Sequence, residues 1–62
     1  MGKNTFEVGT MIGDEWNTTL LENVSYSEAV EFCFNYEGSE KLWLYDTSSH
    51  TTSEFYQYGK QL

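Results

Sequence analysis

One short stretch carries the only strong helix pattern in the chain, and the rest of the fold has to be built around it. Residues 23–38 read NVSYSEAVEFCFNYEG. The hydroxyl of Ser25 can accept a hydrogen bond from an otherwise unpaired N–H of the first turn, which makes it a natural N-cap. Glu28 stands three residues later and completes an S-x-x-E capping box. Gly38 is expected to end the helix, because glycine adopts the left-handed conformation without steric cost.

This helix is expected to be amphipathic. At about 100° per residue, one face is apolar and is formed by Tyr26, Ala29, Val30 and Cys33. Cys33 is the only cysteine in the chain, so no internal disulfide can form. Free cysteine is commonly a small buried residue, and we expect Cys33 to lie in the core. A single unpaired thiol is typical of a reducing compartment, which favours the cytoplasm.

The segments on either side of the helix are expected to be strands. The pattern predicts a hairpin, with strands at residues 5–12 and 16–22 and a turn at 13–15, and two later strands at 41–46 and 54–58. A polar loop is expected at residues 47–53, with an irregular start at 1–4 and a tail at 59–62. The order β-β-α-β-β predicts a single α+β domain over residues 1–62, in which one helix packs on one face of an antiparallel sheet.

A chain of 62 residues has a marginal core, because a domain of this size buries only about 60% of its unfolded surface. One helix can cover one face of the sheet, yet aromatic residues are expected on the other face as well. We therefore predict a homodimer through the second face or an edge strand, with an interface formed by Trp43, Tyr45, Tyr56 and Tyr58. The alternative is that these rings lie in solvent with hydrated hydroxyls.

The charge of the chain limits its partners. Ten acidic residues stand against three lysines and no arginine, which gives a formal net charge of −7. Direct binding to nucleic acid or to an anionic membrane is not expected, because both require a basic surface. The sequence has no apolar run of about 20 residues, and we expect neither a secretion signal nor a membrane span. We expect a cytoplasmic protein that binds a basic partner.

Catalysis is not expected. The adjacent carboxylates, such as those of Asp14 and Glu15, fall at a turn or on an exposed helix face, where nothing would separate their pKa values. A Ser/His/Asp set could be drawn from Ser48, His50 and Asp46, but the composition of a polar loop is enough to produce it. We find no glycine-rich phosphate loop and no metal-ligand spacing, so no cofactor or metal is predicted.

The acidic surface offers a more specific hypothesis. Carboxylates on a small rigid scaffold can present a track of negative charge like that of a phosphodiester backbone. Aromatic side chains between them could enter the apolar pockets in which a DNA-binding protein takes bases. The expected partner-binding residues are Glu28, Glu31, Phe32, Phe34, Tyr36 and Glu37. The alternative is that the acidity only maintains solubility.

Residues 6–45 resemble the small dimeric phage inhibitors of uracil-DNA glycosylase. The likeness lies in three short motifs: F-E-V at the first strand, V-S-Y-S-E at the helix entry and L-W-L-Y in the third strand. That family has a hairpin, a short helix and a further strand, and its dimer blocks the DNA-binding groove of the enzyme by mimicking DNA. The strand expected at residues 54–58 is extra.

In that family a helix aromatic, a glutamate and the apolar dimer groove receive a protruding leucine of the enzyme. Phe32 with Glu28 or Glu31 is the nearest match, although alignment from the helix cap places Ala29 at the aromatic position. The resemblance implies a DNA-mimic inhibitor, with uracil-DNA glycosylase as the target. An anti-CRISPR protein or an inhibitor of host RNA polymerase would share these features. A regulatory domain that binds by strand addition is the alternative without mimicry.

Overall fold

The computed structural model describes residues 4–62, apart from the side chain of Ser53. The irregular start expected at residues 1–4 therefore lies outside this range, except for Asn4, which precedes the first strand. Five strands and one helix occur in the described residues, in the order β1 (Phe6–Ile12), β2 (Glu15–Val24), α1 (Tyr26–Asn35), β3 (Lys41–Asp46), β4 (Thr51–Gln57) and β5 (Lys60–Gln61). The predicted α+β class is confirmed, with one strand more than expected.

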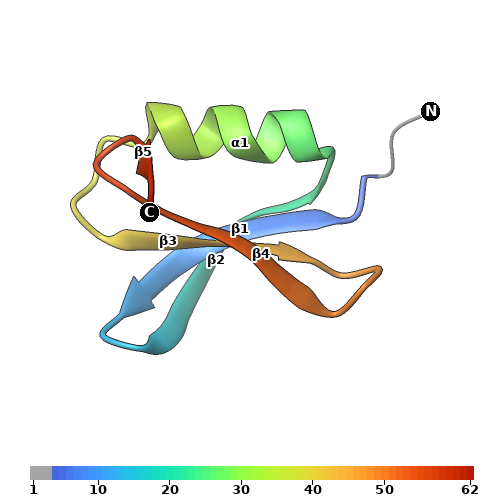
Figure 1. The fold of residues 1–62 in the computed structure, drawn as a ribbon, viewed down its shortest axis with the longest axis horizontal. Coiled ribbons are helices and arrows are strands. Elements are labelled where there is room, and N and C mark those ends of the chain that lie inside the picture. Colours follow the sequence, from blue (N-terminus) through green and yellow to red (C-terminus); the bar gives the residue numbers. More distant parts are fainter. Residues whose placement is uncertain (1–3) are drawn as a thin grey trace.

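The strands form a single antiparallel sheet in the order β2-β1-β3-β4-β5. Strands β2 and β3 both pair with β1, so they run in the same direction. Helix α1 carries the chain from the edge strand β2 to β3 and lies across one face of the sheet (Figure 1). This crossing places the helix above the middle of the sheet. Strands β2 and β5 are the two edges of the sheet.

The start of α1 agrees with the prediction and its end does not. The Oγ atom of Ser25 accepts a hydrogen bond from the Glu28 N–H at 3.2 Å, and Glu28 Oε1 accepts one from the Ser25 N–H at 3.3 Å, which completes the capping box. At the other end, Tyr36 is the C-cap in an extended conformation, and its N–H donates to the Cys33 carbonyl. The helix therefore ends before Gly38, and no left-handed glycine is required.

Two tight turns explain where the strand boundaries differ from the prediction. In the β1–β2 hairpin, Gly13 has a φ of 62°, as the first residue of a type II′ turn requires. In the β4–β5 hairpin, Tyr58 and Gly59 both have positive φ, as in a type I′ turn. The expected tail at residues 59–62 is therefore wrong, since it pairs with β4. The expected loop at 47–53 is also too long, because β4 begins at Thr51.

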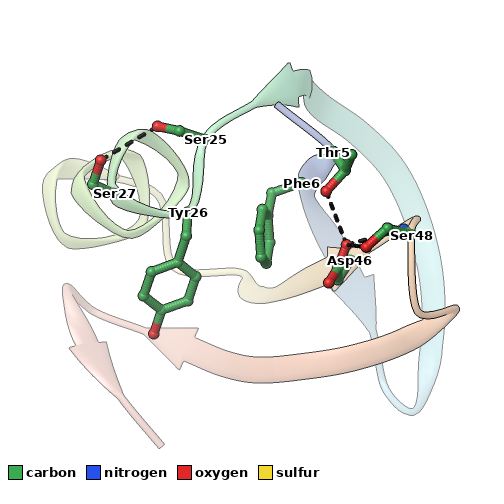
Figure 2. Close-up of a pocket in the computed structure, with 7 residues that line it drawn as sticks. All are labelled: Thr5, Phe6, Ser25, Tyr26, Ser27, Asp46 and Ser48. Atoms are coloured by element: carbon green, nitrogen blue, oxygen red, sulfur yellow. Dashed lines mark hydrogen bonds between the residues drawn. The ribbon is translucent and has the colours of Figure 1, made fainter. Parts of the chain in front are cut away.

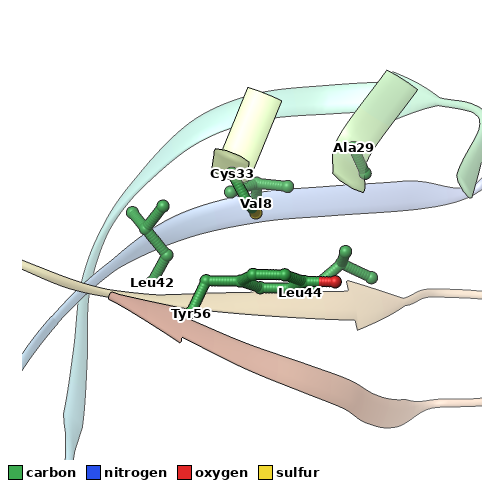
Figure 3. Close-up of a cluster of buried hydrophobic side chains, with 6 residues drawn as sticks. All are labelled: Val8, Ala29, Cys33, Leu42, Leu44 and Tyr56. Atoms are coloured by element: carbon green, nitrogen blue, oxygen red, sulfur yellow. The ribbon is translucent and has the colours of Figure 1, made fainter. Parts of the chain in front are cut away.

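The core lies between α1 and the sheet. Ala29 and Cys33 point from the helix towards the strands (Figure 3), and both are fully buried, which confirms the prediction for Cys33. The sheet side of this cluster is formed by Val8, Leu42, Leu44 and Tyr56. Tyr56 was expected to face away from the helix, together with Tyr58. It lies under the helix instead, with an exposure of 1%.

The second face of the sheet is covered by the chain itself. Trp43 in the central strand β3 pairs with Gly9 in β1, and its indole N–H donates to the Thr10 carbonyl at 2.9 Å. The Trp16 ring from β2 stacks on the Trp43 ring, with centroids 4.0 Å apart and planes within 9°. Trp43 is 1% exposed as a result. Its predicted place in a dimer interface is therefore wrong, because no surface of this ring is left for a second copy.

Gly9 is the position at which this arrangement is most sensitive. A Cβ atom there would collide with the Trp43 ring and with the Thr18 carbonyl oxygen. We predict that Gly9→Ala lowers the free energy of unfolding by about 1–3 kcal/mol, the usual cost of overpacking. Urea unfolding followed by tryptophan fluorescence measures the change.

Thr19→Ala is the control. The Thr19 side chain on β2 is exposed, and substitutions at exposed positions usually change the free energy of unfolding by no more than about 0.5 kcal/mol. Unfolding midpoints that are equal for the two variants would show that the contact between Gly9 and Trp43 is not tight.

Candidate functional site

The negative charge is concentrated in one part of the molecule. Residues 4–40 contain no lysine, arginine or histidine, and they hold eight of the ten acidic residues: Glu7, Asp14, Glu15, Glu22, Glu28, Glu31, Glu37 and Glu40. This part of the chain forms β1, β2, α1 and the loop that follows. The cations of the described chain lie beyond it: Lys41 stands over the Phe55 ring on the second face, and Lys60 lies on the far edge, in β5.

The exposed side of α1 carries part of this charge. Glu28 and Glu31 are three residues apart, so their side chains are neighbours on the helix surface. Both are exposed. Glu28 also serves the capping box, which places its carboxylate at the positive end of the helix dipole. The side chain of Glu31 has no such structural role, so it is the freer of the two to meet a partner.

Two aromatic rings lie beside these carboxylates. The centroids of Phe32 and Tyr36 are 6.0 Å apart, and both residues are half-buried against the core. The Tyr36 hydroxyl donates to Glu40 Oε1 at 3.0 Å. Burial and this hydrogen bond raise the pKa of Tyr36. We call the surface formed by Glu28, Glu31, Phe32, Tyr36 and Glu40 the acidic helix surface.

The structure thus brings together only part of the predicted partner-binding set. Phe34 is about 200° from Phe32 around the helix. Its ring packs edge-on against Tyr56 of β4, with centroids 5.4 Å apart, so it belongs to the opposite flank of α1. Glu37 is exposed in the loop after the helix, near the end of the surface. Glu40 was missing from the predicted set, although its spacing of four residues from Tyr36 is visible in the sequence.

The predicted dimer residues do not form one exposed patch either. Trp43 and Tyr56 are buried on opposite faces of the sheet. Tyr45 is half-buried and stands edge-on to Trp16, with centroids 5.2 Å apart. Tyr58 is 69% exposed in the β4–β5 turn. Alternation within β4 could not show which of its faces meets the helix: Tyr56 pairs with Leu42 on the helix side, whereas Phe55 pairs with Trp43 on the second face.

A cluster of polar groups under the helix was not predicted. The Tyr26 hydroxyl donates to Glu54 Oε2 at 2.6 Å, and the Tyr56 hydroxyl donates to Glu54 Oε1. The hydrogen bond to Glu54 is the main cause that raises the pKa of Tyr26, whereas burial is the main cause that raises that of Tyr56. One carboxylate thus ties the first turn of α1 to β4.

Neither Cys33 nor Ser48 is activated as a nucleophile. Burial raises the pKa of the Cys33 thiol to about 12, so the thiol stays protonated at neutral pH. Ser48 donates to Asp46 from its backbone N–H at 3.0 Å and from its hydroxyl at 2.8 Å, and the His50 ring is 3.5 Å from the Tyr45 hydroxyl. Ser48 is therefore directed at the carboxylate of Asp46 and not at His50, unlike the serine of a catalytic triad.

Within residues 4–62, no group of three His, Cys, Asp or Glu side chains is arranged to hold a metal ion. The helix of the described chain is also too short and too polar to span a membrane. Comparisons with protein-family models, with curated proteins and with solved structures gave no match. The resemblance to the glycosylase inhibitors consequently rests on its three short motifs.

The Tyr26–Glu54–Tyr56 cluster predicts a loss of stability in alkali. Because the pKa values of Tyr26 and Tyr56 are raised in the folded state, their contribution to stability is complete below the unfolded value of about 10. It is lost as the pH rises above that value, towards the raised pKa values. We expect the unfolding midpoint in urea to fall between about pH 9 and pH 12, and Tyr26→Phe should reduce this fall.

Tyr58→Phe is the control, since it removes a hydroxyl from an exposed ring. A pH dependence that is the same for the wild type and Tyr26→Phe would contradict the role given to the Tyr26 hydroxyl.

Proposed function

We propose that this protein is a DNA mimic that occupies the DNA-binding groove of a basic host enzyme in the cytoplasm and inhibits it. The observation that carries the proposal is the acidic helix surface, where carboxylates flank a pair of aromatic rings. No cation occurs in residues 4–40, so positive charge from this part of the chain does not offset those carboxylates. A surface of this kind is complementary to a groove built for phosphates and bases.

The physical basis is electrostatic attraction combined with apolar contact. A basic groove attracts a strongly acidic partner over long range, which raises the rate of association at low salt. On contact, Phe32 and Tyr36 supply apolar area of the kind that dominates interface energies. Both rings are held against the core on one side, so little freedom is lost when the other side is covered.

The resemblance to phage inhibitors makes uracil-DNA glycosylase the named target of this proposal. Phe32 lies beside Glu28 and Glu31 on the acidic helix surface, as the nearest match to the aromatic and glutamate of that family would require. Phe34 is not part of the contact, because it lies on the other flank. An anti-CRISPR protein or an inhibitor of host RNA polymerase would use the same surface against another basic groove.

Two double variants with the same net charge test whether the position of the carboxylates matters, and not only the total charge of the protein. Glu31→Gln with Glu37→Gln removes two carboxylates at the acidic helix surface and its edge, and Asp14→Asn with Glu15→Gln removes two at the hairpin tip. The first variant should weaken inhibition of uracil-DNA glycosylase about tenfold at low salt. The second should weaken it by no more than about twofold, because screening limits distant charges.

Equal effects of the two double variants would show that only net charge matters. No inhibition by the wild type would remove this enzyme as the target. Phe32→Ala is a less clean test, because the ring also packs against the core.

A second candidate is strand addition, and the observation that favours it is the free edge of β2. This strand has ten residues and pairs with β1 on one side only. Its central part, residues 16–21, is uncharged. A partner strand could pair there through backbone hydrogen bonds. Salt separates the two candidates: affinity should fall steeply between about 0.05 M and about 0.3 M salt for mimicry, and it should change little for strand addition.

A homodimer is also part of the proposal, and we propose that its interface lies at the edge strand β2. Trp43 and Tyr56 are buried within one copy, whereas Trp16 and Leu20 on the edge strand β2 are 46% and 39% exposed. A second copy pairing along this edge would cover them, and it would leave the acidic helix surface free for the target. This geometry agrees with the edge-strand form of the predicted dimer.

Sedimentation equilibrium tests the dimer. We expect a species of twice the protomer mass at micromolar concentration, which Leu20→Ser converts to the monomer. Tyr58→Ser should leave the dimer intact, because Tyr58 lies in the turn next to the opposite edge. A monomer at all accessible concentrations would exclude the dimer without affecting the proposed inhibition.

A further inference from the structure

A groove of about 460 Å³ opens at the N-terminal end of α1, between the start of β1 and the end of β3. Figure 2 shows the Phe6 ring in its middle, with Tyr26 on one side and Asp46 on the other. The Phe6 and Tyr26 rings meet edge-to-face, with centroids 5.3 Å apart. The volume is in the range of pockets that hold small ligands. It is ample for one long side chain of another protein.

Asp46 gives this groove a fixed negative charge. Its Oδ1 atom accepts hydrogen bonds from the Thr5 hydroxyl at 3.0 Å, the Ser48 N–H at 3.0 Å and the Ser48 hydroxyl at 2.8 Å. These bonds from Ser48 are the main cause that lowers the pKa of Asp46, so the carboxylate is ionised at neutral pH. Since these three bonds all end on Oδ1, Oδ2 keeps acceptor capacity for a ligand.

The remaining walls do not oppose a cation. The Tyr26 hydroxyl is bound to the carboxylate of Glu54 at 2.6 Å, which fixes the ring and adds a second negative charge near its polar end. The positive end of the α1 dipole would repel a cation, but Glu28 Oε1 accepts hydrogen bonds from both the N–H and the hydroxyl of Ser25. The capping box thereby places a carboxylate at that end of the helix.

We propose that this groove receives an arginine side chain of the basic partner, with the guanidinium on Asp46 and its plane against the Phe6 ring, beside Tyr26. Arginine fits this combination better than lysine, because its planar group both pairs with a carboxylate and stacks on aromatic rings. The inference deepens the proposed function by adding a specific contact to the general attraction of a basic groove. It rests on that function for the identity of the partner, and the site itself is testable without it.

The direct test is an NMR titration of the ¹⁵N-labelled full chain with the peptide Ac-Gly-Arg-Gly-NH2. We expect shifts at the backbone amides of Phe6, Tyr26 and Ser48, with a dissociation constant on the order of 1 mM for one side chain. The matched peptide with citrulline in place of arginine keeps the shape and lacks the charge, so it should bind at least about tenfold more weakly.

Two variants complete the design. Asp46→Asn should weaken binding of the arginine peptide about tenfold, while the oxygen of asparagine can still accept from Ser48. Asp14→Asn makes the same change of net charge at the hairpin tip and should have no effect. The spectra of the free variants report whether each one folds. If Asp46→Asn does not fold, Phe6→Leu, which removes the ring and keeps an apolar side chain, replaces it and should also weaken binding.

Three results would overturn the site: equal binding of the citrulline peptide, arginine binding unchanged by Asp46→Asn or Phe6→Leu, or shifts of the same amides with inorganic phosphate and none with arginine. The last would mean that the helix end binds anions. The arginine site and the proposed function can be contradicted separately. If the arginine peptide binds but no basic enzyme is inhibited, the proposed function is wrong and the groove stands. If Asp46→Asn inhibits the enzyme as well as the wild type, the groove is not used by that partner.

Discussion

The contact between Trp43 and Gly9 is the constraint on which the rest of this structure depends. A small chain with one helix can build a core on one face of its sheet only. Here strand β1 has no side chain at Gly9, so the Trp43 ring from β3 lies against it, and Trp16 from β2 stacks on the outside. The second face is thereby closed by residues of the same chain. The helix surface and the groove beside it are consequently held on a support that is packed from both sides.

Local rules predicted most of the fold. The capping box at Ser25 and the alternating strand at residues 41–46 depend on near neighbours, and both were found as predicted. The errors lie where distant residues decide. The strand β5 forms because Tyr58 adopts a positive φ in a type I′ turn, for which tyrosine is not a typical residue. Similarly, Thr51 joins β4 although it lies within the polar run 47–53, because it pairs with Asp46 of β3.

The candidate site was predicted less well, and the reason is geometric. Helical spacing places Glu28, Glu31 and Phe32 on one arc, so that part could be read from the sequence. The sequence could not show that Phe34 packs on Tyr56, because this contact depends on the position of β4 in the sheet. Glu54 and its two tyrosine donors are 28 and two residues apart in the chain, and Asp46 meets Thr5 over 41 residues. No local sequence pattern predicts such contacts.

The strand order has a consequence for how the molecule approaches a charged surface. Because β2 and β5 are opposite edges of the sheet, the carboxylates of β2 and its turn, Asp14, Glu15 and Glu22, lie away from Lys60, and charge is distributed unevenly across the sheet. In the field of a cationic groove such a body experiences a torque, which turns its more acidic side towards the groove before any atoms touch. The encounter would then begin in a preferred orientation, and fewer collisions would involve the wrong side of the protein.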